Sequence, residues 1–119
     1  MIKRFQDMPV WQESMDLAVK IFEVSEAFPK KEDYSLTSQI RRSALSITAN
    51  IAEAFGRYHK KDKINFYYYA RGSITETQSH LIYSNRINYL NSENTEKLIE
   101  KLEEINKSLN KIIKTLNNK

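Results

Sequence analysis

Apolar residues recur every three or four positions along almost the whole chain, in four segments separated by short connections. This spacing is that of amphipathic helices, because 3.6 residues make one helical turn. The segments predict helices at about 8–27, 36–55, 62–87 and from about 92 nearly to the C-terminus. Four such helices with short loops predict an all-α fold, an antiparallel up-down four-helix bundle that forms a single domain over residues 1–119.

The first of these segments carries two apolar stripes, whereas one is enough to face a bundle core. The additional stripe predicts a second apolar contact, such as one with another subunit. Asp7 is the expected N-cap of this helix, with Pro9 in its first turn. The two stripes are Trp11, Met15, Ala18 and Phe22, and Leu17, Ile21, Val24 and Phe28.

The chain has only two glycines and two prolines. The glycines, and the residues at the helix ends, give further predictions. Gly56 is predicted to end the second helix in the left-handed conformation, and Asn88 to end the third in the same way. Gly72 lies inside the third helix, where glycine costs roughly 1 kcal/mol relative to alanine. We therefore expect it to mark a close helix crossing. The fourth helix carries a coiled-coil-like seam of Leu98, Leu102, Ile105, Leu109, Ile112 and Leu116.

Composition narrows the function classes. The chain has no cysteine, which excludes disulfides, thiolate metal sites and a cysteine nucleophile, and which fits a reducing cytoplasm. No segment has the length and apolarity of a signal peptide or a membrane span, so no membrane association is expected. The net charge of +4 is mildly basic and compatible with a polyanionic partner.

Catalytic chemistry has little support in the sequence. The two histidines are His59 and His80, and Glu76 lies four residues before His80, a spacing that predicts a contact within one helix. A dinuclear metal site needs a second Glu–His pair, which is missing. Two glycines sixteen residues apart exclude a glycine-rich phosphate loop. We expect no catalytic residue, no metal, no cofactor and no enzymatic activity.

The stretch S-I-T-A-N-I-A-E-A-F-G-R combines small residues with three polar ones, Asn50, Glu53 and Arg57. Their spacings of three and four place them near one edge of the helix. A general base would need an acid or a metal as its partner, and neither is visible. The pattern favours a structural polar network that fixes how the next helix leaves.

The best functional lead is the basic, tyrosine-rich segment R-Y-H-K-K-D-K-I-N-F-Y-Y-Y-A-R at 57–71. Clustered cations bind phosphates, and exposed aromatic rings stack on unpaired bases. Alternatively, the segment is a solvated loop beside tyrosines that pack at helix contacts. The fourth helix, with near-balanced Lys and Glu, is expected to be merely solvated. The candidate nucleic-acid-binding residues are Arg41, Arg42, Arg57, Lys60, Lys61, Lys63 and Arg71.

Several motifs together resemble a known family. They are the opening F-Q-D-M-P-V-W-Q-E-S-M-D-L-A, the central T-S-Q-I-R-R-S-A-L-S-I-T-A-N-I-A-E-A-F-G-R, and then A-R-G-S-I-T-E-T-Q-S-H-L and I-N-Y-L. The sequence resembles, over nearly its whole length, the four-helix-bundle proteins encoded in intervening sequences of bacterial large-subunit ribosomal RNA genes. Relatives of these proteins include the accessory variability determinant of diversity-generating retroelements.

The resemblance implies an antiparallel bundle that assembles into a ring, expected to be a homopentamer, without known enzymatic activity. For the retroelement relatives it also implies a basic surface that engages nucleic acid and a reverse transcriptase. Thr48, Ala54 and Asn88 stand where the family pattern usually has Pro, Gly and Gly. Two functions therefore compete: an RNA- or DNA-binding oligomer, and a protein-interaction scaffold without nucleic-acid binding.

Overall fold

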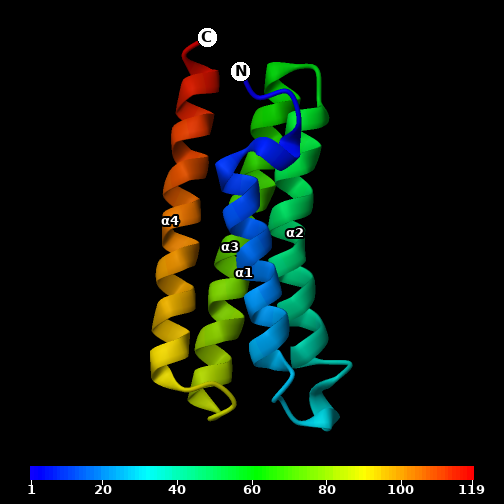
Figure 1. Cartoon of the computed structure of the whole chain (residues 1–119), viewed down its shortest axis with the longest axis vertical. Coiled ribbons are helices and arrows are strands. Elements are labelled where there is room, and N and C mark those ends of the chain that lie inside the picture. Colours follow the sequence, from blue (N-terminus) through cyan, green and yellow to red (C-terminus); the bar gives the residue numbers. More distant parts are fainter.

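Four long helices account for most of the chain in the computed structural model, which describes residues 1–119 and contains no strand. They alternate in direction along a rod of 46 × 24 × 21 Å (Figure 1), so the predicted up-down four-helix bundle is confirmed. None of the helices is both long and apolar enough to cross a membrane. The long helices are α1 (Pro9–Ser25), α2 (Leu36–Gly56), α3 (Lys60–Arg86) and α4 (Ser92–Asn117), and the short 3-10 turns are η1 (Phe5–Asp7) and η2 (Lys30–Glu32).

The start of α1 differs from the expectation. Met8 occupies the N-cap position and Pro9 is the first helical residue. Asp7 does not cap the helix, because it lies in η1 and its carboxylate accepts a hydrogen bond from Arg4 at 3.2 Å. A proline at the first position has no N–H to satisfy, which lessens the need for a capping side chain. At α4, by contrast, the side chain of Asn91 caps the helix by accepting from the Asn94 amide at 2.7 Å.

The two predicted left-handed helix ends have different outcomes. Asn88 has φ 66° and confirms the prediction for α3. Gly56 has no positive φ: α2 continues through it and the chain leaves in an extended conformation at Arg57. A left-handed turn normally satisfies the last helical carbonyls. Here the Lys63 ammonium does so instead, donating to the Ala54 and Phe55 carbonyls at 3.3 and 2.9 Å.

Gly72 does not mark a close crossing, contrary to the expectation. It lies on the exposed side of α3, and a Cβ built on it would meet no heavy atom within 4 Å. The close contact between α2 and α3 is made instead by small hydroxyl residues. Thr77 donates to Ser43 at 2.8 Å, and Ser73 donates to Ser46 at 3.0 Å.

A continuous core of 22 buried apolar residues runs through the bundle. In α1 the stripe that contains Leu17 and Ile21 faces this core, whereas Phe22 on the other stripe is 50% exposed. In α4 the core position is Ile113 rather than the predicted Ile112. The side chains that are fully buried and largest are Ile21, Ile40, Ile47, Ile51, Ile74, Leu81, Leu102, Ile105 and Leu109.

Candidate nucleic-acid interface

Three segments that are far apart in the sequence meet at one end of the bundle. Figure 1 shows both termini and the connection between α2 and α3 at its upper end. The Lys60 ammonium donates to the Lys119 carbonyl at 2.8 Å, which joins this connection to the C-terminus. Ile2 and Met8 line one groove with Lys111, so the N-terminal segment lies against the C-terminal half of α4.

This end of the bundle is strongly basic, and we call residues 1–8, 53–64 and 107–119 the basic pole. It carries ten basic and three acidic side chains, a net side-chain charge of +7. The whole chain carries +4, so the remainder of the bundle is net −3. The basic side chains are Lys3, Arg4, Arg57, Lys60, Lys61, Lys63, Lys107, Lys111, Lys114 and Lys119, and the acidic ones are Asp7, Glu53 and Asp62.

Much of this charge comes from α4, which was expected to be balanced. All five of its glutamates lie between Glu93 and Glu104, and from Asn106 onward the chain contains four lysines and no acid. The segregation matches the helix dipole, which favours acids near the N-terminus and bases near the C-terminus. The total numbers of Lys and Glu in α4 hide this gradient. The order of the residues along the helix shows it, once the fold has placed each end of α4.

Four of the seven predicted binding residues lie in the basic pole, and they differ in availability. Lys61 is exposed and has no hydrogen-bond or ion-pair partner within the chain. Lys60 is exposed but contacts the C-terminal carbonyl. The Arg57 guanidinium is held by Glu53 at 3.0 Å and lies 4.6 Å from the ring centre of Phe66. Lys63 is partly buried and caps α2, so its charge serves the fold.

The other three predicted residues lie away from the pole. Arg42 precedes Arg57 by fifteen residues, about 22 Å along a helix. Arg41 is engaged within the protein: it donates to the Ser25 hydroxyl at 2.8 Å and to the Phe22 carbonyl at 3.2 Å. These contacts tie the end of α1 to α2. Arg71, on α3, stacks over the Tyr68 ring at 5.4 Å.

The expected network of Asn50, Glu53 and Arg57 divides into two parts. Glu53 and Arg57 form the ion pair described above, near the end of α2. Asn50 contacts neither of them and donates to the carbonyl and hydroxyl of Ser46 at 2.9 and 3.1 Å. Because Ser46 also accepts from Ser73, Asn50 belongs to the contact between α2 and α3. Each part has a structural role at a helix contact or a helix end.

The two histidines lie in different surroundings. His80 Nε2 lies 3.3 Å from a carboxylate oxygen of Glu76 on the same helix, the intrahelical contact expected from their spacing. His59 is exposed just before α3. No three His, Asp or Glu side chains converge on one point.

The tyrosines of the 57–71 segment divide between core and surface. Tyr67 is 4% exposed, and this burial raises the pKa of its hydroxyl. Tyr68 and Tyr69 are about half exposed along α3. Tyr58 is 90% exposed and lies in the basic pole, with its ring edge-on to His59 at a centroid distance of 5.1 Å. The spacing of the tyrosines along the sequence could not predict which of them are buried and which are exposed.

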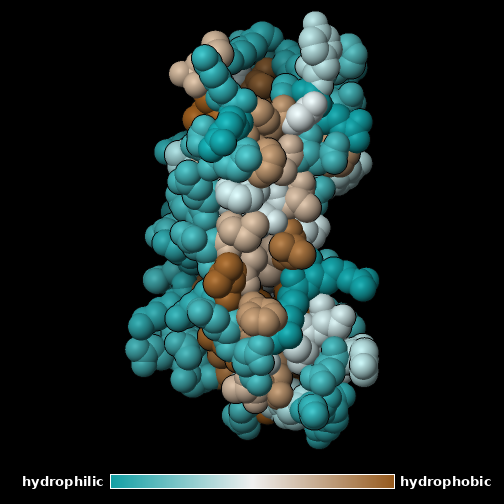
Figure 2. All heavy atoms as spheres, turned by 45° about the vertical axis from the view of Figure 1, so that its right-hand side comes forward, coloured by the Kyte–Doolittle hydropathy of each residue, from teal (hydrophilic) through white to brown (hydrophobic).

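An apolar groove of about 260 Å³ lies between α1 and α2. The stripe of α1 that does not face the core forms one wall, with Met15, Val19 and Phe22, and Leu45 of α2 stands opposite. Val19, Phe22 and Leu45 are 51%, 50% and 55% exposed. Figure 2 shows the resulting band of hydrophobic atoms along the molecule, with hydrophilic residues on both sides.

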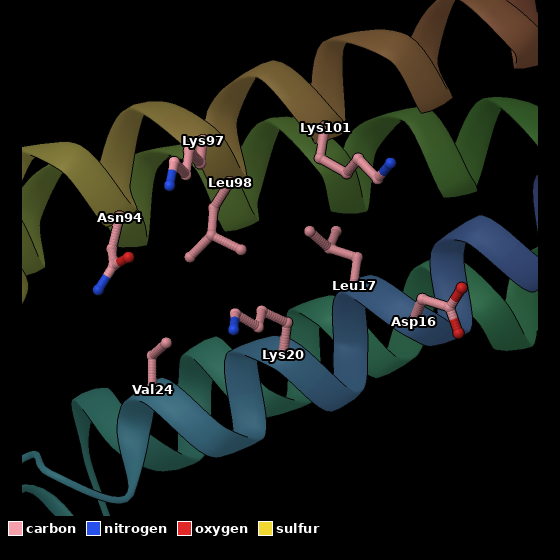
Figure 3. Close-up of a pocket in the computed structure, with 8 residues that line it drawn as sticks. All are labelled: Asp16, Leu17, Lys20, Val24, Asn94, Lys97, Leu98 and Lys101. Atoms are coloured by element: carbon pink, nitrogen blue, oxygen red, sulfur yellow. The ribbon is translucent and has the colours of Figure 1, made fainter.

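A second groove, of about 230 Å³, separates α1 from α4 (Figure 3). Leu17 and Leu98 face one another across it, and the ammonium groups of Lys20, Lys97 and Lys101 lie at its rim. Lys97 is paired with Glu93 at 3.2 Å, whereas Lys20 has no partner within the chain. The groove thus has an apolar floor and an edge with three lysines and one carboxylate, that of Asp16.

A comparison with protein families places the chain. Residues 6–111 match the 23S rRNA-intervening sequence protein family. The chain belongs to this family. The match spans the motifs from Q-D-M-P near the N-terminus to I-N-Y-L after α3 and continues into the second half of α4, and it confirms the first part of the resemblance. The match gives no link between this member of the 23S rRNA-intervening sequence protein family and retroelement determinants.

A solved structure supports the assignment. A protein of unknown function from the S23 ribosomal protein family of Bacteroides thetaiotaomicron is 32% identical, with a TM-score of 0.79. The alignment covers 88% of this chain and 98% of the Bacteroides chain. No curated protein matches the sequence.

Proposed function

We propose that this protein is a cytoplasmic, non-enzymatic homo-oligomer that binds RNA or DNA through its basic pole. The observation that carries the proposal is the separation of charge along the bundle, with +7 gathered at one end of a chain whose net charge is +4. Phosphate contacts supply most of the affinity of sequence-independent binding, because each neutralised phosphate releases condensed counterions. Membership of a family named after ribosomal RNA intervening sequences is compatible with such a ligand.

The available cations of the pole define the contact. Lys3, Lys61, Lys107, Lys111 and Lys114 are exposed, and none has an ion-pair or hydrogen-bond partner within the chain. They can therefore move onto phosphates without breaking a contact of the fold. Arg57 and Lys60 contribute charge from positions that are already held, and Lys63 is excluded because α2 needs it.

Two matched charge reversals test the proposal. Lys60→Glu with Lys61→Glu alters the pole, and Lys30→Glu with Lys31→Glu alters a Lys-Lys pair at the opposite end. Each variant has a formal net charge of 0 instead of +4, so a difference between them reports position rather than total charge. We expect the first variant to bind a mixed RNA and DNA pool more weakly and with a shallower salt dependence, and the second to bind nearly as the original protein does.

The lysines of α4 provide an independent check by fluorescence anisotropy. Lys111→Glu with Lys114→Glu should weaken binding as much as the change at Lys60 and Lys61, although these pairs are about fifty residues apart in the sequence. No measurable binding of the original protein at low salt would refute the proposal. Equal losses at the two ends of the bundle would refute the pole as the site.

The homo-oligomeric part of the proposal rests on the apolar groove between α1 and α2. An exposed apolar band of this kind marks a protein contact. A homopentamer, five times the 14.0 kDa chain, is the assembly that the resemblance implies. Phe22→Glu with Leu45→Glu should lower the mass measured by light scattering. Ile82→Glu, at a residue 47% exposed on α3, is the control and should leave the mass unchanged.

The second candidate function is a scaffold that binds an acidic protein partner, and the groove between α1 and α4 favours it. Its apolar floor and lysine rim suit an amphipathic segment that carries carboxylates. A reverse transcriptase is one partner that the resemblance suggests. A pull-down after nuclease treatment separates the functions: a protein retained by the original chain, and lost with Lys20→Glu and Lys97→Glu, would favour the scaffold.

A further inference from the structure

The basic pole carries an aromatic ring that the fold does not use. Tyr58 stands in the short connection between α2 and α3, is 90% exposed, and its ring lies roughly perpendicular to that of His59 at a centroid distance of 5.1 Å. Burial of an aromatic side chain is among the larger stabilising terms in folding, and this ring obtains almost none of it. Its neighbours in the chain are the cations Arg57, Lys60 and Lys61.

We propose that the pole binds unpaired nucleotides, with Tyr58 as the platform on which a base stacks; this inference rests on the proposed nucleic-acid binding. Single-strand-binding surfaces combine cations that hold the backbone with exposed rings that receive the bases. Any base has a flat face, so such a site requires no sequence motif in the ligand. The ring and the free ammonium of Lys61 are within three residues of one another, which supplies both parts in one place.

The shape of the pole favours a single strand over a duplex. In a duplex the base faces are stacked inside, so an external ring reaches them only at an end. Reading a duplex groove requires an element such as a helix laid along its side. The pole is built from helix ends, namely the end of α2, the start of α3 and the end of α4 (Figure 1). It offers a ring and scattered cations rather than a helix flank.

The opposite end of the bundle contains a natural control. Tyr34 is 100% exposed and lies in the connection between α1 and α2. Its surroundings differ in the amount of charge. Residues 26–42, which include the Arg41 and Arg42 that line a groove with Tyr34, hold four basic and three acidic side chains, a net +1 against +7 for the basic pole. The chain therefore presents two highly accessible tyrosines, and only Tyr58 stands in a large excess of cations.

The test compares Tyr58→Ala and Tyr34→Ala in fluorescence anisotropy. The probes are an unpaired oligonucleotide of roughly 10 nucleotides, as RNA and as DNA, and a blunt duplex of the same length. We expect Tyr58→Ala to weaken binding of the unpaired probe by roughly fivefold to a hundredfold, the range for loss of one stacked base. Tyr58→Phe should retain the affinity and Tyr34→Ala should change nothing. Binding of the duplex, which offers base faces only at its two ends, should change far less with Tyr58→Ala than binding of the unpaired probe.

The salt dependence separates stacking from charge. Tyr58→Ala removes no cation, so the slope of affinity against salt should stay that of the original protein, whereas it decreases with Lys60→Glu and Lys61→Glu. Unchanged affinity of Tyr58→Ala for the unpaired probe, with weak binding by the lysine variant, would overturn the stacking inference and leave the proposed function standing. If the original protein binds neither probe at low salt, both fail.

Discussion

Gly72 offers the most direct test of the surface of α3. The residue is inside a 27-residue helix, with no positive φ, and a Cβ added to it meets nothing within 4 Å. Alanine at this position therefore introduces no clash and no strain. It removes the conformational freedom that glycine has in the unfolded chain. Gly72→Ala should stabilise the protein.

The size of the effect follows from helix propensity. Glycine is about 1 kcal/mol less favourable than alanine in a helix interior. A domain of 119 residues has an unfolding entropy near 0.25 kcal/mol/K, so Tm should rise by about 4 °C. Thermal and urea unfolding followed by circular dichroism at 222 nm would measure both quantities. The urea m-value should stay constant, because the buried surface is unchanged.

The control is a change in the opposite sense on the same helix. Ser79 is also exposed, and Ser79→Gly should destabilise by about 0.5 kcal/mol, the difference between the two propensities. A loss of stability in Gly72→Ala would refute the reasoning, since it would mean that something packs closely against this glycine. If the group that packs against Gly72 belongs to another subunit, the loss of stability would be accompanied by a lower mass in light scattering.

Three further predictions concern single side chains. Thr37 has a buried hydroxyl with no hydrogen-bond partner, so Thr37→Val should raise the free energy of unfolding by about 1 kcal/mol. Thr77→Val should lower it, because the Thr77 hydroxyl is hydrogen-bonded. Urea titrations of both variants measure the two changes. The hydroxyl groups of Ser35 and Tyr89 donate to the Glu32 carboxylate and hold its pKa below the ordinary value. A lowered carboxyl pKa gives stability that is lost as the pH falls through it, so Tyr89→Phe should raise this pKa in a ¹³C NMR titration and flatten the loss of stability below about pH 4.5. Lys63→Met should destabilise by about 1 kcal/mol, since it leaves the Phe55 carbonyl unpaired and removes one of the two donors to the Ala54 carbonyl. It should affect nucleic-acid binding less than Lys61→Met; a larger effect on binding would place Lys63 in the interface.

Helix positions and the fold class could be predicted because they depend on local periodicity. The predicted helices at 36–55 and 62–87 differ from α2 and α3 by at most two residues at each end. Asn88 was predictable as well, since few residues tolerate a positive φ. Gly56 and Gly72 were not, because their roles depend on neighbours from other parts of the chain. A lysine seven residues after Gly56 replaces the expected turn, and empty space surrounds Gly72.

The candidate site was predictable only in part, for the same reason. The segment from Arg57 to Lys63 was found as a local cluster of charge. Arg41 was also predicted as a binding residue, but its guanidinium is held against α1 by Phe22 and Ser25. Lys111 and Lys114 were overlooked, since their membership of the pole depends on the end of α4 returning to the start of α3. Tertiary placement, rather than composition, decides which charges act together.

The unequal charge of the two ends has a consequence for assembly. A closed ring relates its subunits by rotation about one axis, so rods that lie parallel to that axis all point the same way. If neighbours meet through the flank that holds Phe22 and Leu45, every basic pole lies on the same side of the ring. The assembly is then a disc with one strongly cationic face and one nearly neutral face. A polyanion would meet several copies of Tyr58 at once, and affinity would increase through multivalency rather than through any stronger single contact.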